Sequence, residues 1–238
     1  MTDVYAPPPP PPPPPARPDS VAFDFIRPFA FVFEDPRWLP KVLIGGLFVL
    51  ASFVLIGAFF LFGYIARLVR NVIAGMQHPL PEWDDLGEYF GEGLLLFVVA
   101  LIYSAPVVLL AILVAVPAMI LSGVQSDNVR DIGGGVFGCA WCVIAPLSLA
   151  LWFIVPAALL MVITSGRFGA AFEFSRIWSF IKENIGNYLL AIVVYLVSRF
   201  AAGFGLILLC IGIIFTEFWA MTVAGYAFGE VYRLSQKR

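Results

Sequence analysis

The sequence predicts an all-α fold: a polytopic transmembrane helical bundle with interfacial amphipathic helices. Only 13% of the 238 residues are charged, against about a quarter in soluble domains, and the mean hydropathy is +0.93. The apolar runs exceed the roughly 20 residues that a helix needs to cross a membrane, and they lack the alternation of barrel strands. The 21 glycines and the 16% aromatic share are typical of closely packed membrane helices.

Residues 1–20 are expected to form a disordered, proline-rich N-terminal tail. The prolines at 7–15 lack a backbone N–H and have a fixed φ, which predicts an extended polyproline II rod. Such a rod is a ligand for aromatic-lined grooves, although a stiff soluble tail is the simpler interpretation. Residues 21–238 are predicted to be one integral membrane helical domain.

Residues 21–40 mix phenylalanines with charged side chains. This segment is too charged to span a membrane and too aromatic to remain in water, so we expect an amphipathic segment lying in the interface. Trp38 and Lys41 are then expected to anchor the start of the next helix in the interface.

Five apolar membrane elements follow, at about residues 41–65, 94–121, 136–164, 188–206 and 208–229. Prolines are expected to kink the second and third elements: Pro106, Pro117, Pro146 and Pro156. A polar loop is expected at 122–135. The last run, 188–228, is about twice as long as a membrane is thick, so we expect two helices with a turn near Gly203-Phe204-Gly205.

The charge distribution bears on topology. If 41–65 enters the membrane and returns, with a break near Ser52 or Gly57, all but two of the 14 Lys and Arg residues lie on one side. Only Arg130 then lies opposite, with Arg199 near a turn. The positive-inside rule favours this arrangement, although 41–65 is also long enough for a single span. We therefore expect a multi-pass protein of the inner, cytoplasmic membrane with both termini in the cytoplasm.

The polar segment 63–93, between the first two elements, carries an ordered set of residues: Gly63-Tyr64, Arg67, Arg70, Leu80-Pro81-Glu82-Trp83-Asp84-Asp85 and Gly93. Three further segments accompany it: Asp35-Pro36-Arg37-Trp38, Lys182-Glu183-Asn184-Ile185-Gly186-Asn187-Tyr188 and Gly229-Glu230-Val231-Tyr232-Arg233. With these features the chain resembles the domain of unknown function 4013 family of prokaryotic multi-helix membrane proteins, over about residues 22–233. The resemblance implies that architecture and, because the family's activity is unknown, no catalytic residue.

The same polar segment supplies six candidate functional residues: Arg67, Arg70, Glu82, Trp83, Asp84 and Asp85. Carboxylates at this density, with Glu88 and Glu92 close behind, are ligands for hard cations. However, the spacing of a calcium-binding EF-hand loop is absent. A structural turn that places the tryptophan at the interface is therefore the favoured interpretation.

Arg199 and Glu217 are the other candidates, because ionisable groups inside apolar runs are costly and often functional. A turn near Leu208 would place them level as a pair. A turn at Phe204 would leave Arg199 close enough to water to snorkel. A structural role is favoured over a place in a substrate or proton path.

The expected function is that of a non-catalytic membrane scaffold or accessory module, without a cofactor or a metal. The lipid bilayer is the expected partner, with other membrane proteins or a proline-tract-binding protein as further candidates. The net charge of −2 and the lack of a basic stripe exclude nucleic acid.

Two alternatives stay open. One is a transporter or lipid-handling protein that uses Arg199 and Glu217, which predicts a water-accessible cavity at mid-membrane lined by these groups, whereas a scaffold predicts a dry apolar interior. The weaker one is a membrane thiol oxidoreductase through Cys139-Ala-Trp-Cys142. That CxxC pair begins a membrane helix, where cysteine is usually a small apolar filler.

Overall fold

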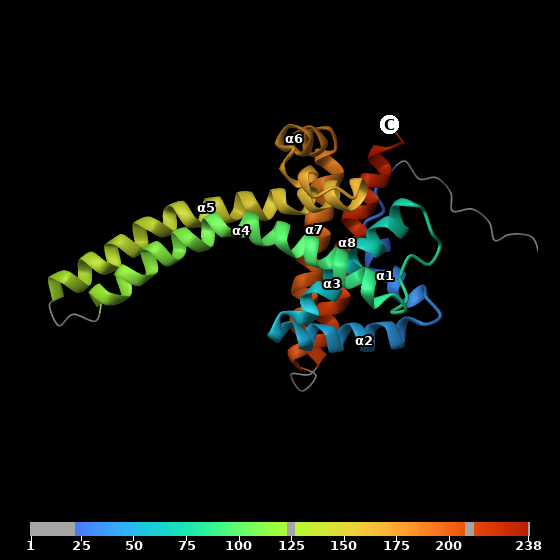
Figure 1. Cartoon of the computed structure of the whole chain (residues 1–238), viewed down its shortest axis with the longest axis horizontal. Coiled ribbons are helices and arrows are strands. Elements are labelled where there is room, and N and C mark those ends of the chain that lie inside the picture. Colours follow the sequence, from blue (N-terminus) through green and yellow to red (C-terminus); the bar gives the residue numbers. More distant parts are fainter. Residues whose placement is uncertain (1–21, 123–126, 208–211, 238) are drawn as a thin grey trace, which may run out of the picture.

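The computed structural model describes residues 22–122, 127–207 and 212–237, which form helices without any strand (Figure 1). The α-helices are α1 (Arg27–Glu34), α2 (Trp38–Ala51), α3 (Ile56–Ile73), α4 (Leu86–Ser122), α5 (Asp127–Ser165), α6 (Phe174–Glu183), α7 (Ile185–Gly203) and α8 (Gly212–Ser235). Three short 3-10 turns accompany them: η1 (Ser52–Val54), η2 (Phe168–Phe172) and η3 (Phe204–Ile207). The all-α prediction is confirmed. The proline tail and Leu208 lie outside the described residues.

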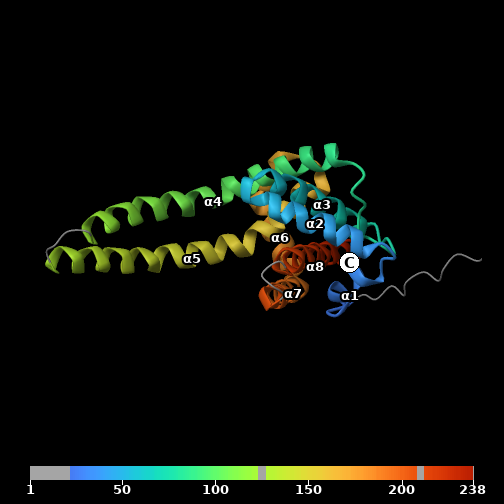
Figure 2. The same cartoon turned by 90° about the horizontal axis from the view of Figure 1, so that it is seen from below.

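The long helices pair into three hairpins, α2–α3, α4–α5 and α7–α8 (Figures 1 and 2). The chain breaks at η1, and Leu55 adopts a left-handed conformation (φ 65°) that turns α3 back along α2. The rings of Phe48 and Phe60 then pack 4.8 Å apart across the break. The break expected near Ser52 is confirmed, and α7 ends at Gly203 with the 3-10 turn η3 directly after it.

The open ends of the three hairpins meet at one end of the molecule, which we call the polar end. There the Arg70 side chain of α3 donates to the Ile163 carbonyl of α5 (3.3 Å). The ring of Phe180 in α6 lies 5.8 Å from that of Tyr232 in α8. Each hairpin therefore leaves the polar end and returns to it.

Four helical segments are long and apolar enough to cross a membrane: Ile56–Ile73, Leu86–Leu121, Gly138–Ser165 and Ile185–Ile207. The expected membrane element at 208–229 corresponds to α8, which is not among them. That set rests on length and composition alone; in the structure α8 packs between α2, α3 and α7 and buries much of its length against protein. Side chains such as Thr222 and Glu230 are buried there by protein, which tolerates them better than hydrocarbon does.

The α4–α5 hairpin extends as an arm well beyond the other helices (Figures 1 and 2). Its outer part exposes large apolar side chains such as Leu109, Leu113 and Met119, which suits contact with lipid. The loop expected at 122–135 is wrong in part, because α5 is helical from Asp127. In apolar surroundings a helix is favoured because its backbone groups bond to one another. Helices α4 and α5 accordingly continue along the arm, and each contains two prolines within its length.

Glycine brings α3 and α4 into backbone contact. A Cβ atom at Gly93 would collide with the Phe59 carbonyl, and one at Gly63 would collide with the Tyr89 carbonyl. Small residues at such crossings let membrane helices approach closely.

Candidate functional site

The loop between α3 and α4 is fixed through four consecutive backbone carbonyls, those of residues 79–82. The two prolines in this stretch supply no N–H and keep it extended, so its carbonyls need donors from elsewhere. Side chains of α2, α3 and α4 donate to them in turn: Asn71 to Pro79 (2.9 Å), Lys41 to Leu80 (2.9 Å), Tyr64 to Pro81 (2.9 Å) and Tyr89 to Glu82 (2.5 Å). We call this arrangement the pinned loop.

Trp83 fastens the pinned loop to the α2–α3 hairpin. Its ring stacks on Tyr64 (4.1 Å between centroids) and on Phe48 (4.7 Å), and its indole N–H donates to the Lys41 carbonyl (3.0 Å). The side chain is half-buried among protein rings. Trp83 therefore positions the loop, in keeping with the structural turn that the sequence favours.

Lys41 is the buried centre of this site. Its ammonium group lies 2.7 Å from an Asp35 oxygen and 2.7 Å from a Glu82 oxygen, and the residue is only 4% exposed. The prediction that Lys41 anchors in the interface is therefore wrong. The reason is that two carboxylates and a carbonyl supply the hydrogen-bond acceptors that an interfacial ammonium group takes from water and headgroups.

The other charged candidates tie α3 to α4. Arg67 pairs with Glu88 (3.0 Å) and Arg70 with Glu92 (2.7 Å), at successive turns of the two helices. Asp85 accepts the Glu88 backbone N–H (3.1 Å) and so caps the start of α4.

The acidic groups of the loop do not converge. Asp84 lies on the exposed surface, whereas Glu82 faces Lys41 and Arg37. Within the part of the chain that the structure describes, no three His, Cys, Asp or Glu residues are arranged to hold a metal ion. A polar hollow of about 410 Å³ adjoins the loop, and most of its charged lining residues belong to the ion pairs given above. The pinned loop and its ion pairs therefore hold α2, α3 and α4 together.

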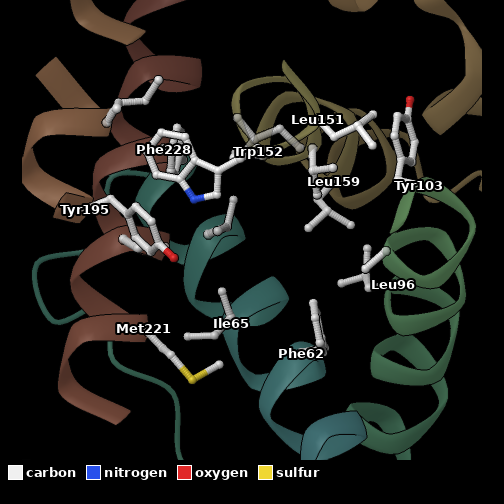
Figure 3. Close-up of a pocket in the computed structure, with 18 of the residues that line it drawn as sticks. Phe62, Ile65, Leu96, Tyr103, Leu151, Trp152, Leu159, Tyr195, Met221 and Phe228 are labelled. Carbon is white, nitrogen blue, oxygen red and sulfur yellow. The ribbon is translucent and has the colours of Figure 1, made fainter. Parts of the chain in front are cut away.

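A second site, which we call the inner cavity, lies between α3, α4, α5, α7 and α8. Its volume is about 660 Å³, within the range of about 300–1,000 Å³ of small-molecule sites. Figure 3 shows apolar side chains that surround it from several helices: Phe62, Ile65, Leu96, Leu151, Trp152 and Phe228. The Tyr103 hydroxyl points away from it and donates to the Ala171 carbonyl (2.5 Å).

The inner cavity is elongated. Its lining runs along α5 from Ile163, near the polar end, to Ser148, which is about 22 Å of helix. Along α8 it runs from Phe228 to Glu217, which is about 16 Å. The cavity therefore reaches from near the polar end into the part of the molecule formed by the candidate spans.

Arg199 and Glu217 line the far end of the inner cavity, and they form an ion pair through Nη1 and Oε1. They are its charged lining residues. Their side chains keep 43% and 27% of their surface exposed, so the pair is open to the cavity. The ion pair brings them level, which is the paired arrangement that the sequence left open.

Cys139 and Cys142 lie exposed on the arm, as free thiols. The Cys142 thiol donates to the Gly138 carbonyl one turn before it (3.5 Å). Neither residue lines the inner cavity.

Sequence reasoning found the loop and the Arg199–Glu217 pair but missed the donors Asn71, Tyr64 and Tyr89. The signal for them was the pair of prolines at 79 and 81. Prolines keep a segment extended, so its backbone carbonyls need donors from side chains elsewhere in the chain. The inner cavity had no such signal, since its lining residues look like any other apolar helix positions.

Comparison with known proteins gives one family match. Residues 46–211 match the family described as "Protein of unknown function (DUF4013)". Neither the curated proteins nor the solved structures give a match. The matched range contains the pinned loop and Arg199 and is more than half of the chain, which confirms the resemblance seen in the loop motif. The chain is a membrane protein that belongs to the DUF4013 family.

Proposed function

We propose that this protein is a non-catalytic lipid-binding protein of the cytoplasmic membrane, which holds the apolar chain of a membrane lipid in the inner cavity. The observation that carries the proposal is the cavity itself. It is lined mainly by apolar side chains and lies among helices that can span a membrane. A pure scaffold would fill this space with side chains, so the structure favours the lipid-handling alternative.

The proposal includes a route of entry. The α4–α5 arm diverges from α3 and from the α7–α8 hairpin (Figure 1), and residues of all these helices line the inner cavity. A lipid chain entering between them stays in hydrocarbon throughout, and so avoids the cost of crossing water.

We propose that the polar end faces the cytoplasm. It gathers Arg67, Arg70 and the cations around α6, in agreement with the positive-inside rule. Helix α6 supports this position, because it exposes Phe174 and Trp178 beside Lys182, whose ammonium lies 5.3 Å from the Trp178 ring. An aromatic and basic helix of this kind belongs in the headgroup region.

The experiment is to fill the cavity. Ala100 on α4 lines it, whereas Ala115 on the same helix is exposed and does not. Photoactivatable phospholipids, carried in vesicles with the purified protein, should label cavity peptides such as the one that contains Trp152. Ala100→Phe should reduce that labelling several-fold, and the matched control Ala115→Phe should leave it unchanged. Equal labelling of the two variants, with both folded by circular dichroism, would refute lipid binding in the cavity.

A scaffold role is the second candidate, and the arm favours it. The outer part of α4 presents Leu109, Leu113 and Val116 outward, a surface on which another membrane protein can pack. A scaffold function would survive Ala100→Phe and would be lost with polar substitutions at these three positions. Capture of membrane partners by chemical cross-linking in cells, compared between the two sets of variants, separates the candidates.

A further inference from the structure

We infer that the inner cavity selects amphiphiles with an anionic headgroup, a phosphate or a carboxylate, and that Arg199 binds this headgroup at the far end. This inference rests on the proposed function and specifies its ligand. The observations that carry it are the place of the ion pair in the cavity, its exposure and its depth.

Arg199 has binding capacity that Glu217 does not use. A guanidinium carries five N–H donors in a planar fork, and the contact that the structure describes for it joins Nη1 to one Glu217 oxygen. With 43% of the Arg199 side chain exposed, the rest of the fork is accessible from the cavity. Phosphate and carboxylate oxygens match this fork in bidentate geometry.

The depth of Arg199 sets the orientation of the ligand. Fourteen residues of α7 separate it from Ile185 at the polar end, which is about 21 Å of helix, and α7 ends at Gly203. The hydrocarbon core is about 30 Å thick, so Arg199 lies toward the leaflet opposite the polar end. A lipid of that leaflet places its headgroup at Arg199 and its chain along Leu151 and Ile65 toward the polar end.

Glu217 acts as an internal substitute for the headgroup. Without ligand it neutralises Arg199, whose isolated charge would be costly at this depth. An incoming anionic headgroup displaces the carboxylate from the guanidinium. The two halves of the ion pair should therefore affect binding in opposite directions, which a purely structural pair would not do.

The test measures binding to the purified full chain in detergent by quenching of tryptophan fluorescence, because Trp152 lines the cavity. The probes are phosphatidic acid and diacylglycerol, both with brominated chains. The Trp152→Phe variant identifies the cavity signal, and inorganic phosphate is offered alone as a competitor. The variants are Arg199→Gln, Glu217→Gln and the double variant that combines both. The double variant has the same net charge at the site as the wild-type ion pair, so it controls for effects on folding.

We expect wild type to bind phosphatidic acid about tenfold more tightly than diacylglycerol, the value of one charge-assisted hydrogen bond. Arg199→Gln should abolish this preference, and Glu217→Gln should strengthen binding of phosphatidic acid while leaving diacylglycerol unchanged. Weaker binding of phosphatidic acid by Glu217→Gln, or equal affinities of wild type for both lipids, would overturn the inference and leave lipid binding in place. Competition by inorganic phosphate at equal affinity would overturn the lipid as ligand. Absence of cavity quenching by either lipid would overturn the proposed function itself.

Discussion

Gly91 and Gly93 of helix α4 lie two residues apart and face different surroundings, and alanine substitutions there test how α3 and α4 pack. At Gly93 an added Cβ would lie 2.6 Å from the Phe59 carbonyl carbon and 2.8 Å from the Gly63 nitrogen. At Gly91 an added Cβ would meet nothing within 4 Å. Gly93→Ala should therefore destabilise the protein, with Gly91→Ala as the matched control.

The magnitude follows from the geometry. Carbon atoms pack at about 3.5–4.0 Å, and the Phe59 carbonyl oxygen is closer to the added Cβ than the carbonyl carbon or the Gly63 nitrogen, so α4 must move outward by more than about 1 Å to accept the methyl group at Gly93. The opposing atoms are backbone and cannot rotate away. Overpacking of this kind costs about 1–3 kcal/mol. The gain in helix propensity from glycine to alanine, up to about 1 kcal/mol, is common to both substitutions and cancels in their difference. The free energy of unfolding should thus be about 1–3 kcal/mol lower for Gly93→Ala than for Gly91→Ala.

The assay is equilibrium unfolding of the two variants in mixed detergent micelles, followed by circular dichroism. Gly63→Ala lies across the same contact, so combining it with Gly93→Ala should cost less than the sum of the single losses, since helices already separated accept the second methyl group more easily. Equal stabilities of Gly91→Ala and Gly93→Ala, within about 0.5 kcal/mol, would refute the backbone contact between α3 and α4.

Three further predictions concern charge and thiol chemistry. Lys41→Met leaves the buried Asp35 carboxylate without its ammonium partner and should lower the free energy of unfolding by about 3–5 kcal/mol. Adding Asp35→Asn should recover part of that loss. A double variant as unstable as Lys41→Met alone would contradict the pairing. The neighbouring arginines hold the pKa of Glu173 below its ordinary value of 4.5, by hydrogen bonding and by charge, so its stabilising effect is present above that value and is lost as the pH falls through the lowered pKa. The midpoint of thermal unfolding should therefore fall more for wild type than for Glu173→Gln on acidification from about pH 6 to about pH 3, and parallel curves would count against it. Cys139 and Cys142, exposed on the arm, should react with membrane-permeant maleimides in vesicles more readily than with charged ones, and preferential labelling by the charged reagent would place this part of α5 in water.

The sequence predicted much of the helical framework, because its signals are local. The break near Ser52 follows from the distribution of Lys and Arg along the chain, and the end of α7 near Gly203 follows from an apolar run that no single helix in a membrane can accommodate. The capping of α4 by Asp85 likewise depends on a neighbour within a few residues.

Other features depend on contacts between distant residues, which composition does not encode. From its position before an apolar run, Lys41 is predicted to be an interfacial cation, but in the structure Asp35 and Glu82 surround its ammonium group. The sequence predicts a membrane element over most of α8, whereas its burial comes from α2 and α3, which are distant in the sequence, and from α7, against which the chain folds back. The inner cavity is lined by residues of five helices, and its apolar lining residues, Trp152 included, do not differ in the sequence from ordinary apolar helix positions.

The pinned loop has a consequence for the order in which the chain assembles. Its carbonyls are satisfied by donors from α2, α3 and α4, so the loop cannot close before Lys41, Tyr64 and Tyr89 are all in place. Until then its carbonyls must remain in contact with water, which delays their burial against the bundle. We therefore expect the loop to close only after α2, α3 and α4 have docked against one another.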